Sequence, residues 1–308
     1  MNNSELIKQL EVPKGKVDVV LDTDAFNEID DQYAIAYMLR SDDRLNAKAI
    51  YAAPFFNSHS TSPEDGMERS YDEILKIVSL CGRDDLKSNI FKGSRNYLSD
   101  EKTPVVSPAA EDLAKRAMEY SKENPLYVVA IGAITNVASA ILINPEIVNR
   151  IVIVWLGGHG CHIPKSVGEF NMRQDIAAAR VIFGCGAPVV QLPCAGVVSA
   201  FTVSKYELEY WLKDKNPLAD YLARNTIREV EERPDYKERV WTRVIWDVTA
   251  VAWLLNEKEK FMIETVEHSI IPEYDMEYAR SSKRHFMKYI CYIKRDALMG
   301  DLFAKLLK

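Results

Sequence analysis

Five acidic residues fall within ten positions near the start of the chain: Asp22, Asp24, Glu28, Asp30 and Asp31. They follow an apolar run typical of a buried strand and lead into an amphipathic segment. In open α/β sheets, ligands bind at the carboxyl ends of the strands. Carboxylates that converge in a partly dry site repel one another by on the order of several kcal/mol, and nothing basic lies among these five. We therefore expect a cation as their partner.

The chemistry of the donors narrows the choice of cation. Every nearby donor is an oxygen atom, and such a set favours a hard ion such as Ca²⁺ or Mg²⁺ over zinc. A structural alternative is that Asp30 and Asp31 merely favour a helix N-terminus. Asp24 or Asn27 would then cap that helix. This alternative leaves the acids at the strand end, Asp22 above all, without a reason, so we predict a metal site.

An Asp-x-Asp sequence after a first strand also opens the haloacid-dehalogenase phosphatases. In that family a Thr or Val usually follows two residues after the second Asp, where this chain has Phe26. Gly300 and Asp301 could imitate the late acidic motif of those enzymes, but they fall in a segment typical of a surface helix. The phosphatase stays as an alternative interpretation.

The composition and net charge of the chain limit the kinds of partner that it can bind. The chain has 308 residues and a formal net charge of −6, and its basic residues are scattered among acidic ones. Binding to a nucleic-acid backbone needs a basic face, so we expect no nucleic-acid partner. No stretch approaches the roughly 20 apolar residues of a membrane helix, and the polar start lacks the apolar core of a signal peptide. Five cysteines without a CxxC pair indicate reduced thiols, and we expect a cytoplasmic protein without a membrane partner.

Short apolar runs alternate with amphipathic stretches along the chain. This pattern predicts an α/β fold, an open and mostly parallel β-sheet flanked by helices. The expected strands and helices are strands at 17–21, 49–53, 126–131, 151–156, 188–192, 263–271 and 287–293, and helices at 29–39, 71–81, 135–142, 176–183, 248–255 and 297–307. Residues 208–232 are typical of one long polar helical region, within a helical excursion over about 204–240. Without a repeat or a flexible linker, we expect a single domain over residues 1–308.

Five segments in order along the chain resemble the inosine–uridine nucleoside hydrolase family. The first strand of that family ends in Asp-x-Asp-Pro-Gly-x-Asp-Asp, and its four acids match Asp22, Asp24, Asp30 and Asp31. The other four segments are 129–136 (VAIGAITN), 155–158 (WLGG), 169–171 (EFN, with Asp175 and Ala178 beyond) and 246–250 (WDVTA). Each segment alone is weak, but five in the same order over roughly residues 16–255 are specific.

The resemblance implies a hydrolase that cleaves the N-glycosidic bond of a ribonucleoside, a small-molecule substrate, to free base and ribose. Ca²⁺ would be ligated by the carboxylates of Asp24, Asp31 and Asp247 and by the main-chain carbonyl of Ile131. Asp24 would also be the general base that deprotonates the attacking water. Asp30, Glu169 and Asn171 would bind the ribose hydroxyls, and Asp22 would support the metal ligands. Asn57 would also bind ribose, although its match to the family is looser.

The residue before the last Asp ligand bears on the leaving base. The nonspecific branch of the family has a His there, whereas this chain has Trp246, which cannot protonate a base. The purine-preferring branch is similar to this chain in carrying Trp. Stacking makes the purine more basic, and stacking on one aromatic is typically worth about 1–3 kcal/mol. The resemblance thus implies a purine preference, with Asp24 and Trp246 as catalytic residues, and a homodimer or homotetramer. Tyr97 or Trp241 could supply a second aromatic face.

Departures from the family pattern leave a further alternative open. The gap from Asp24 to Asp30 is two residues longer than in the family, and Ala25-Phe26 replaces Pro-Gly. These changes favour, as an alternative, a non-catalytic protein that binds nucleosides or sugars with the help of a metal.

The loop before residue 169 departs from the pattern as well. Ile163 stands where the family has an Asn in contact with ribose, and His159 and His162 could compensate or be solvated. We expect Thr135 and Asn136 to cap the next helix rather than touch the substrate. Structural interpretations also stand for Asp247 as a helix cap, Glu169 and Asn171 as loop residues and Trp246 as core packing.

Overall fold

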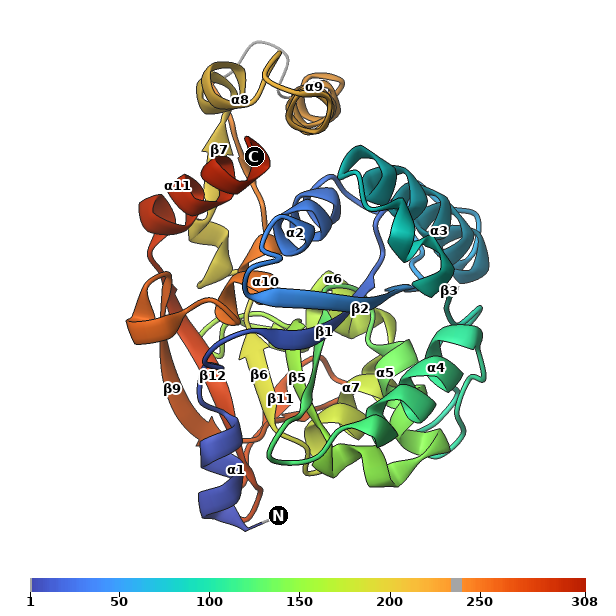
Figure 1. The fold of residues 1–308 in the computed structure, drawn as a ribbon. Coiled ribbons are helices and arrows are strands. Elements are labelled where there is room, and N and C mark those ends of the chain that lie inside the picture. Colours follow the sequence, from blue (N-terminus) through green and yellow to red (C-terminus); the bar gives the residue numbers. More distant parts are fainter. Residues whose placement is uncertain (1, 234–239) are drawn as a thin grey trace.

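An eight-stranded sheet forms the centre of the computed structural model, which describes residues 2–233 and 240–308. The strand order is β3-β2-β1-β4-β5-β6-β12-β9, and every neighbouring pair is parallel except β12 and β9 (Figure 1). The strands of the sheet are β1 Val17–Thr23, β2 Leu45–Ala52, β3 Ile90–Lys92, β4 Leu126–Ala130, β5 Ile151–Leu156, β6 Val189–Leu192, β9 Met262–His268 and β12 Phe286–Ile293. The predicted open, mostly parallel sheet is confirmed.

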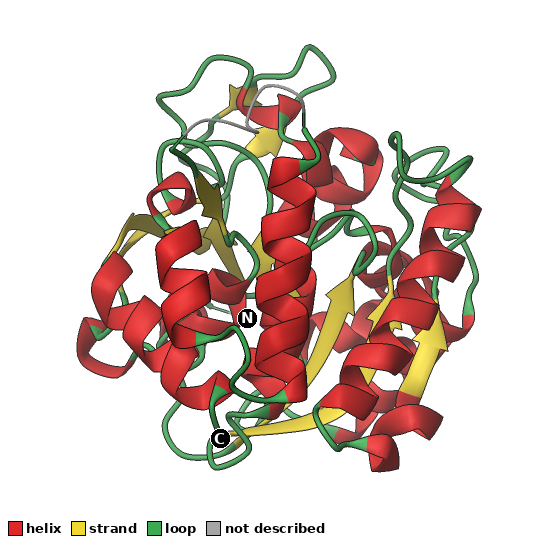
Figure 2. Ribbon diagram, turned by 90° about the horizontal axis from the view of Figure 1, so that it is seen from above, coloured by secondary structure: helices red, strands yellow, loops and turns green. Residues whose placement is uncertain are grey.

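Helices cover both faces of this sheet, as Figure 1 shows from the side and Figure 2 from above. Successive residues of a strand point to opposite faces, so each strand feeds two apolar cores. The helices of one core are α2 Asp30–Leu39, α3 Pro63–Leu80, α9 Pro217–Glu231, α10 Val248–Trp253 and α11 Arg295–Leu306. The helices of the other core are α4 Pro108–Arg116, α5 Thr135–Ile143 and α7 Ile176–Gly184.

The smaller elements lie around this frame. They are α1 Asn3–Gln9, α6 Phe170–Gln174, α8 Lys205–Trp211, the antiparallel pair β7 Thr202–Ser204 and β8 Thr242–Val244, and the antiparallel pair β10 Ile271–Pro272 and β11 Tyr278–Ala279. Within the described ranges, no helix is both long and apolar enough to cross a membrane.

The long helical region expected over 208–232 is two helices, α8 and α9. α8 ends at Trp211 and α9 begins at Pro217; Asn216 has the extended backbone that proline favours in the residue before it. The Asn216 side chain accepts a hydrogen bond from the backbone N–H of Ala219 and so caps α9, with Pro217 at its first position. Residues 234–239 of the expected excursion lie outside the described residues.

The sheet brings the carboxyl ends of β1, β4 and β5 side by side. Asp22 pairs with Ala130 in the register of β1 and β4, and Ala130 pairs with Trp155 in that of β4 and β5. The segments that follow these strands, beginning at Asp24, Ile131 and Gly157, therefore leave the sheet at one edge. Ligands of open α/β sheets bind at such an edge.

Candidate active site and metal centre

Three carboxylates meet at this edge of the sheet. Asp30 and Asp31 begin α2, and Asp247 directly precedes α10. One carboxylate oxygen of each lies within 4.8 Å of the other two, and all three residues are buried. Oxygens bound to one Ca²⁺ at about 2.3–2.6 Å cannot be more than roughly 5 Å apart. The three acids thus fit a single hard cation.

The capping roles in the helix-terminus alternative are wrong, although Asp30 and Asp31 do lie in the first turn of α2. The residue before α2 is Ile29, and no side chain caps that helix; Asp24 and Asn27 do not do so. Asp247 stands at the cap position of α10, but its side chain makes no capping hydrogen bond. The carboxylates are therefore left available to one another and to a ligand.

Asp24 and Ile131, the other two expected ligands, line the same cavity, but Asp24 is not among the three acids whose oxygens all lie within 4.8 Å of one another. Asp24 Oδ2 is buried and has no hydrogen-bond partner among the described residues. A Cβ placed on Gly132 would lie only 2.7 Å from Asp24 Oδ1, so the glycine leaves room for this carboxylate. The Ile131 carbonyl accepts a hydrogen bond from Asn171 Nδ2 at 2.9 Å. Their role as ligands stays a prediction.

Burial raises the pKa values of the clustered acids. For Asp24, Asp31 and Asp247 it does so well above the usual range, and neighbouring carboxylates raise these pKa values further. The pKa of Asp30 is raised to about 7, because burial outweighs the opposing effect of Arg243. Asp30 Oδ1, like Asp24 Oδ2, has no hydrogen-bond partner within the described part of the chain. Buried carboxylates with free oxygens are a donor set that a divalent cation satisfies.

No basic residue lies within the acidic segment itself, but the fold brings one to it from a distant part of the chain. Arg243 of β8 places its Nη2 2.8 Å from Glu28 Oε2, 3.4 Å from Glu229 Oε1 and 3.7 Å from Asp30 Oδ1. Burial alone would lower the pKa of this guanidinium, but Asp30, Glu28 and Glu229 raise it on balance. No local signal in the sequence could reveal this contact, because Arg243 comes from a distant strand.

Asp22 lies beneath the cavity rather than in its lining. Its Oδ1 accepts a hydrogen bond from Asn136 Nδ2 at 2.7 Å, and burial raises the pKa of Asp22 to about 7 although this bond lowers it. Asn136 also donates to the Ala52 carbonyl and accepts from the Ser94 N–H. The expectation that Thr135 and Asn136 cap α5 is therefore wrong: tertiary partners take up Asn136, and Thr135 Oγ1 donates to Asp175.

Glu169 and Asn171 form a rigid wall rather than a polar loop. The Glu169 carboxylate accepts hydrogen bonds from the N–H groups of Gly158, Asn171 and Met172 at 2.9–3.0 Å. Asn171 Nδ2 donates to the carbonyls of Ile131 and Leu156 and so joins the ends of β4 and β5. Oε2 accepts two of these bonds and Oε1 only one, so Glu169 can still accept from a ligand hydroxyl through Oε1.

A cavity of about 270 Å³ opens above the acids. Its lining residues are Asp24, Asn27, Glu28, Asp30, Asp31, Asn57, Ile131, Leu156, His159, Glu169, Phe170, Asn171, Cys194, Trp246 and Asp247. The expected acids other than Asp22 and the expected Asn57, Asn171 and Trp246 are thus brought together. Asn57 is held by Asn27, whose Oδ1 accepts from Asn57 Nδ2 at 2.5 Å.

The second aromatic residue of the cavity is Phe170, which was not among the expected site residues. Tyr97 and Trp241 do not line the cavity: Tyr97 donates its hydroxyl to Gln174, and Trp241 is buried in the core. The signal for Phe170 was the Glu-Phe-Asn motif itself, whose middle residue received no role. Trp246 is only partly buried, so it is not simply core packing.

Of the loop residues, His159 lines the cavity, whereas His162 is exposed and Ile163 does not take part. The Ala195 N–H donates to His159 Nδ1 at 3.2 Å, so a neutral ring carries its proton on Nε2. Burial lowers the pKa of His159. At neutral pH this ring is therefore a neutral donor that faces the cavity.

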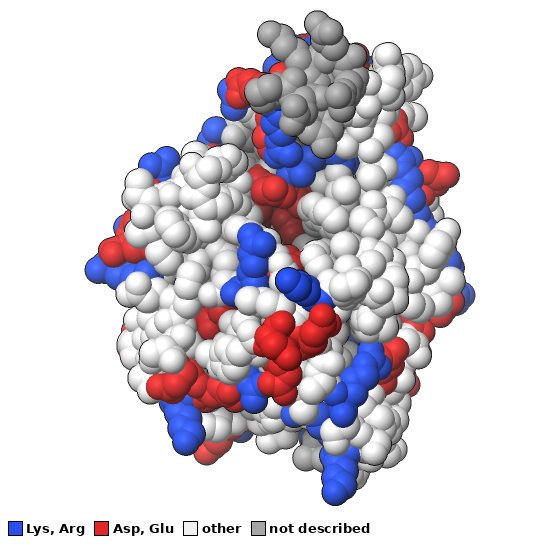
Figure 3. All heavy atoms as spheres, turned by 180° about the vertical axis from the view of Figure 1, so that it is seen from behind, with Lys and Arg blue, Asp and Glu red and all other residues white. Residues whose placement is uncertain are grey.

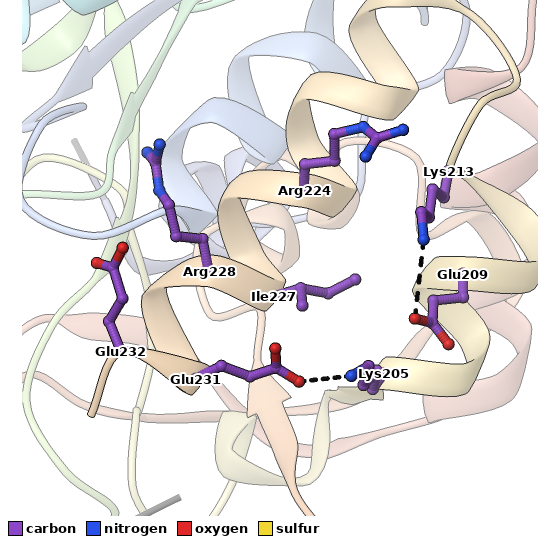
Figure 4. A pocket seen from close by; sticks show the side chains of 8 residues that line it. All are labelled: Lys205, Glu209, Lys213, Arg224, Ile227, Arg228, Glu231 and Glu232. Atoms are coloured by element: carbon purple, nitrogen blue, oxygen red, sulfur yellow. Dashed lines mark hydrogen bonds and ion pairs between the residues drawn. The ribbon is translucent and has the colours of Figure 1, made fainter. Parts of the chain in front are cut away.

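A larger cavity, of about 970 Å³, is a groove between α8 and α9 (Figure 4). Its charged side chains pair with one another, as Lys205 does with Glu231 and Lys213 with Glu209. None of the clustered acids lines it, so it is not the site.

Another cavity, of about 640 Å³, adjoins the site and shares Asn27 and Glu28 with it. Figure 3 shows acidic side chains inside a hollow on one face of the molecule, with basic side chains scattered among acidic ones around it. Among the described residues on this face, the charges do not form the basic stripe that a nucleic-acid backbone needs.

Comparisons with known proteins agree with this geometry. A sequence model of the inosine-uridine preferring nucleoside hydrolase family matches residues 19–288. The pyrimidine-specific ribonucleoside hydrolase RihA of Escherichia coli O1:K1 / APEC is 25% identical over 286 residues, which cover 85% of this chain and 86% of that protein.

Two solved structures have the same fold. A plant nucleoside hydrolase, PpNRh1, superposes with a TM-score of 0.73 at 19% identity and covers 94% of this chain and 99% of its own. The purine-preferring ribonucleoside hydrolase from Gardnerella vaginalis gives a TM-score of 0.71 at 19% identity, with 94% and 98% covered.

We predict that a divalent cation stabilises the metal-free protein. A cation present at 100 times its Kd adds roughly 2.7 kcal/mol to the free energy of unfolding, which raises Tm by about 4 °C in a chain of this size. Calorimetry on chelator-treated protein, with Ca²⁺ and Mg²⁺ added in turn, measures the shift. Asp31→Asn should reduce it. If neither ion moves Tm at millimolar concentration, the acids do not form a metal centre.

We also predict that Asn136→Ala destabilises the protein by about 2–4 kcal/mol, because it leaves the buried Asp22 carboxylate without its hydrogen bond. Urea unfolding measures the free energy. The matched control is Asn124→Ala, at an exposed position, with an expected change within about 0.5 kcal/mol. Equal losses in the two variants would contradict the supporting role of Asn136.

Proposed function

The chain belongs to the inosine-uridine preferring nucleoside hydrolase family, and from that premise we propose that it hydrolyses the N-glycosidic bond of ribonucleosides, with a bound Ca²⁺ and a preference for purines. One observation carries the proposal: buried acids with free oxygens converge under a cavity that two aromatic side chains also line. A cytoplasmic location and a homodimer or homotetramer are part of the proposal, and they rest on the thiol content and the family resemblance.

The residues present fit a calcium ion. The donors are carboxylates, with the Ile131 carbonyl nearby, and Ca²⁺ accepts such oxygens in flexible geometry. Asp31 and Asp247 would hold it, together with Asp24 and Ile131 as the family resemblance implies. When bound, the ion supplies positive charge that binds sugar hydroxyls and makes a nearby water more acidic.

Asp24 is the residue to take the proton of the attacking water. Its Oδ2 faces no competing hydrogen-bond donor among the described residues, and Gly132 leaves space beside it. A well-placed carboxylate base contributes on the order of 10²–10⁴ in rate.

The sugar is held by groups that are themselves fixed. Asp30, Glu169, Asn171 and Asn57 line the cavity and are positioned by hydrogen bonds. Fixed groups lose little freedom when a substrate binds, which helps catalysis. The carboxylates also favour the positive charge that develops on the ribose ring as the glycosidic bond breaks.

Trp246 and Phe170 would bind the leaving base. A purine offers a large π-face, and stacking makes it easier for solvent to protonate the departing ring. The neutral His159 is a weak acid for this purpose, which supports activation by stacking. Two of the three named relatives differ, one being pyrimidine-specific and one purine-preferring, so we take base preference to depend on this chain's own pocket.

The late acidic motif of the phosphatase alternative, Gly300 and Asp301, does not reach the acid cluster in the structure. Asp301 lies in α11, accepts a hydrogen bond from Tyr37 and pairs with Lys260 and Lys305. It does not line the cavity of the acid cluster.

We predict that purified protein releases reducing sugar from inosine and that chelation abolishes the release. Asp24→Ala should lower kcat by about 10³ or more, because the proton acceptor is gone. The matched control is Asp72→Ala, an exposed acid of α3, which should retain wild-type rates. If Asp24→Ala hydrolyses as fast as wild type, the mechanism is wrong. Calcium-dependent binding of nucleosides without sugar release would instead identify a non-catalytic binding protein.

We predict that Trp246→Ala lowers kcat/KM for inosine by about 10- to 100-fold, the loss expected when one stacking face is removed. The same change should affect p-nitrophenyl riboside much less, because that leaving group needs no protonation. Phe170→Ala should show the same contrast, and Tyr97→Phe should show none, since Tyr97 does not line the cavity. Equal losses on both substrates would refute the stacking role.

A further inference from the structure

Resting on the proposed function, we propose that Arg243 is a positioning residue with two effects: it fixes the Asp30 carboxylate for the sugar, and its charge limits how tightly the acid cluster binds a cation. The observation behind this proposal is that the Arg243 guanidinium contacts three acids from three different segments. They are Glu28, Asp30 and Glu229, and Asp30 belongs to the acid cluster.

Arg243 reaches this place because β8 pairs with β7. Val203 is its partner in the register, and the chain then returns to the site through Ile245, whose N–H donates to the Phe201 carbonyl. The Arg243 side chain is only 11% exposed. It lines neither the inner cavity nor the adjoining one, so it acts through its neighbours rather than by touching a ligand.

Each of the three acids around Arg243 lines one or both of the two cavities. Asp30 lines the inner cavity, Glu229 of α9 lines the adjoining one, and Glu28 lines both. A single guanidinium, with its donors in a rigid fork, can hold several carboxylates at once. Arg243 therefore fastens α9 and the β1–α2 loop to the start of α2, and it fixes the wall that the cavities share.

Asp30 is held from two sides by one short segment. Its Oδ2 accepts a hydrogen bond from the Trp246 N–H at 3.1 Å, and its Oδ1 faces Arg243 Nη2 at 3.7 Å. Because both contacts come from residues 243–246, the orientation of this carboxylate follows the position of that segment. Loss of the guanidinium leaves Oδ1 free to turn away from the sugar or further toward the ion.

The charge of Arg243 opposes that of a bound cation. Its guanidinium contacts Asp30, an oxygen of which lies within 4.8 Å of oxygens of Asp31 and Asp247. Like charges separated by several ångströms in a partly buried site interact strongly enough to change affinity by about 10-fold or more. Removal of this positive charge should therefore tighten cation binding, whereas simple damage to the site would weaken it.

The test is calorimetric titration of metal-free protein with Ca²⁺, together with nucleoside kinetics at saturating Ca²⁺. Arg243→Gln should lower the Kd for Ca²⁺ by about 10-fold or more and raise KM by about 10-fold, with a smaller change in kcat. Arg243→Lys keeps the charge but not the fork, so its Kd should stay within about 3-fold of wild type while KM rises. The matched control is Arg116→Gln, which removes a partly buried arginine of α4 that pairs with Asp112. It should change neither the Kd for Ca²⁺ nor KM.

A second variant covers the case in which Arg243→Gln does not fold. Arg243→Gln combined with Glu28→Gln restores the charge balance and removes one stranded acid. Its Kd for Ca²⁺ should lie within about 3-fold of wild type, and its KM should remain raised. A wild-type KM in this double variant would overturn the positioning role, and a Kd changed by 10-fold or more would overturn the charge effect.

The outcomes separate this inference from the proposed function. An Arg243→Gln protein that folds and binds Ca²⁺ as wild type does, or more weakly, overturns the inference alone, provided that wild type binds the ion. A wild-type protein that binds no Ca²⁺ overturns the proposed function and the inference with it.

Discussion

The mutual repulsion of buried carboxylates is the constraint on which the rest of this structure depends. Asp24, Asp30, Asp31 and Asp247 are all buried at one edge of the sheet, where water screens their charges poorly. Several contacts near them reduce this repulsion: Thr23 Oγ1 donates to Asp31 at 2.5 Å, the Trp246 N–H donates to Asp30, and Arg243 adds a positive charge. These contacts still leave oxygens free. A fold that keeps acids in such a place has a use for them, and binding of a hard cation is the use that the donor set favours.

Much of the site was predictable from the sequence because the strands and the acids are local features. The apolar run of β1 and the acids after it lie within one segment, and α/β folds place such strand ends at a common edge. Asp247 lies far along the chain from the other acids and could be found only through the family motif. Nothing in the sequence around it distinguishes a metal ligand from a helix cap.

The parts that could not be predicted depend on contacts between distant segments. Asn136 has the features of a helix cap, yet its side chain donates to Asp22, because a hydrogen bond to a carboxylate is stronger than one to a neutral backbone group. Arg243 reaches the acids only through the pairing of β7 with β8. The break between α8 and α9 is different in kind: Asn216 and Pro217 are a readable signal for a helix start, and hydrophobic periodicity alone obscured it. The short strand β3 has too few residues to show a period.

Gly132 carries no side chain, and its bare backbone leaves the room in which the Asp24 carboxylate stands. Any larger residue would press on Asp24 and on Ala53 together, so the two strand ends would have to separate before the carboxylate could keep its place. For protein engineers who wish to widen the pocket, this position is closed to change, although it makes no bond to a ligand. A side chain at this position would therefore displace the Asp24 carboxylate even though every acid of the cluster remained in the sequence.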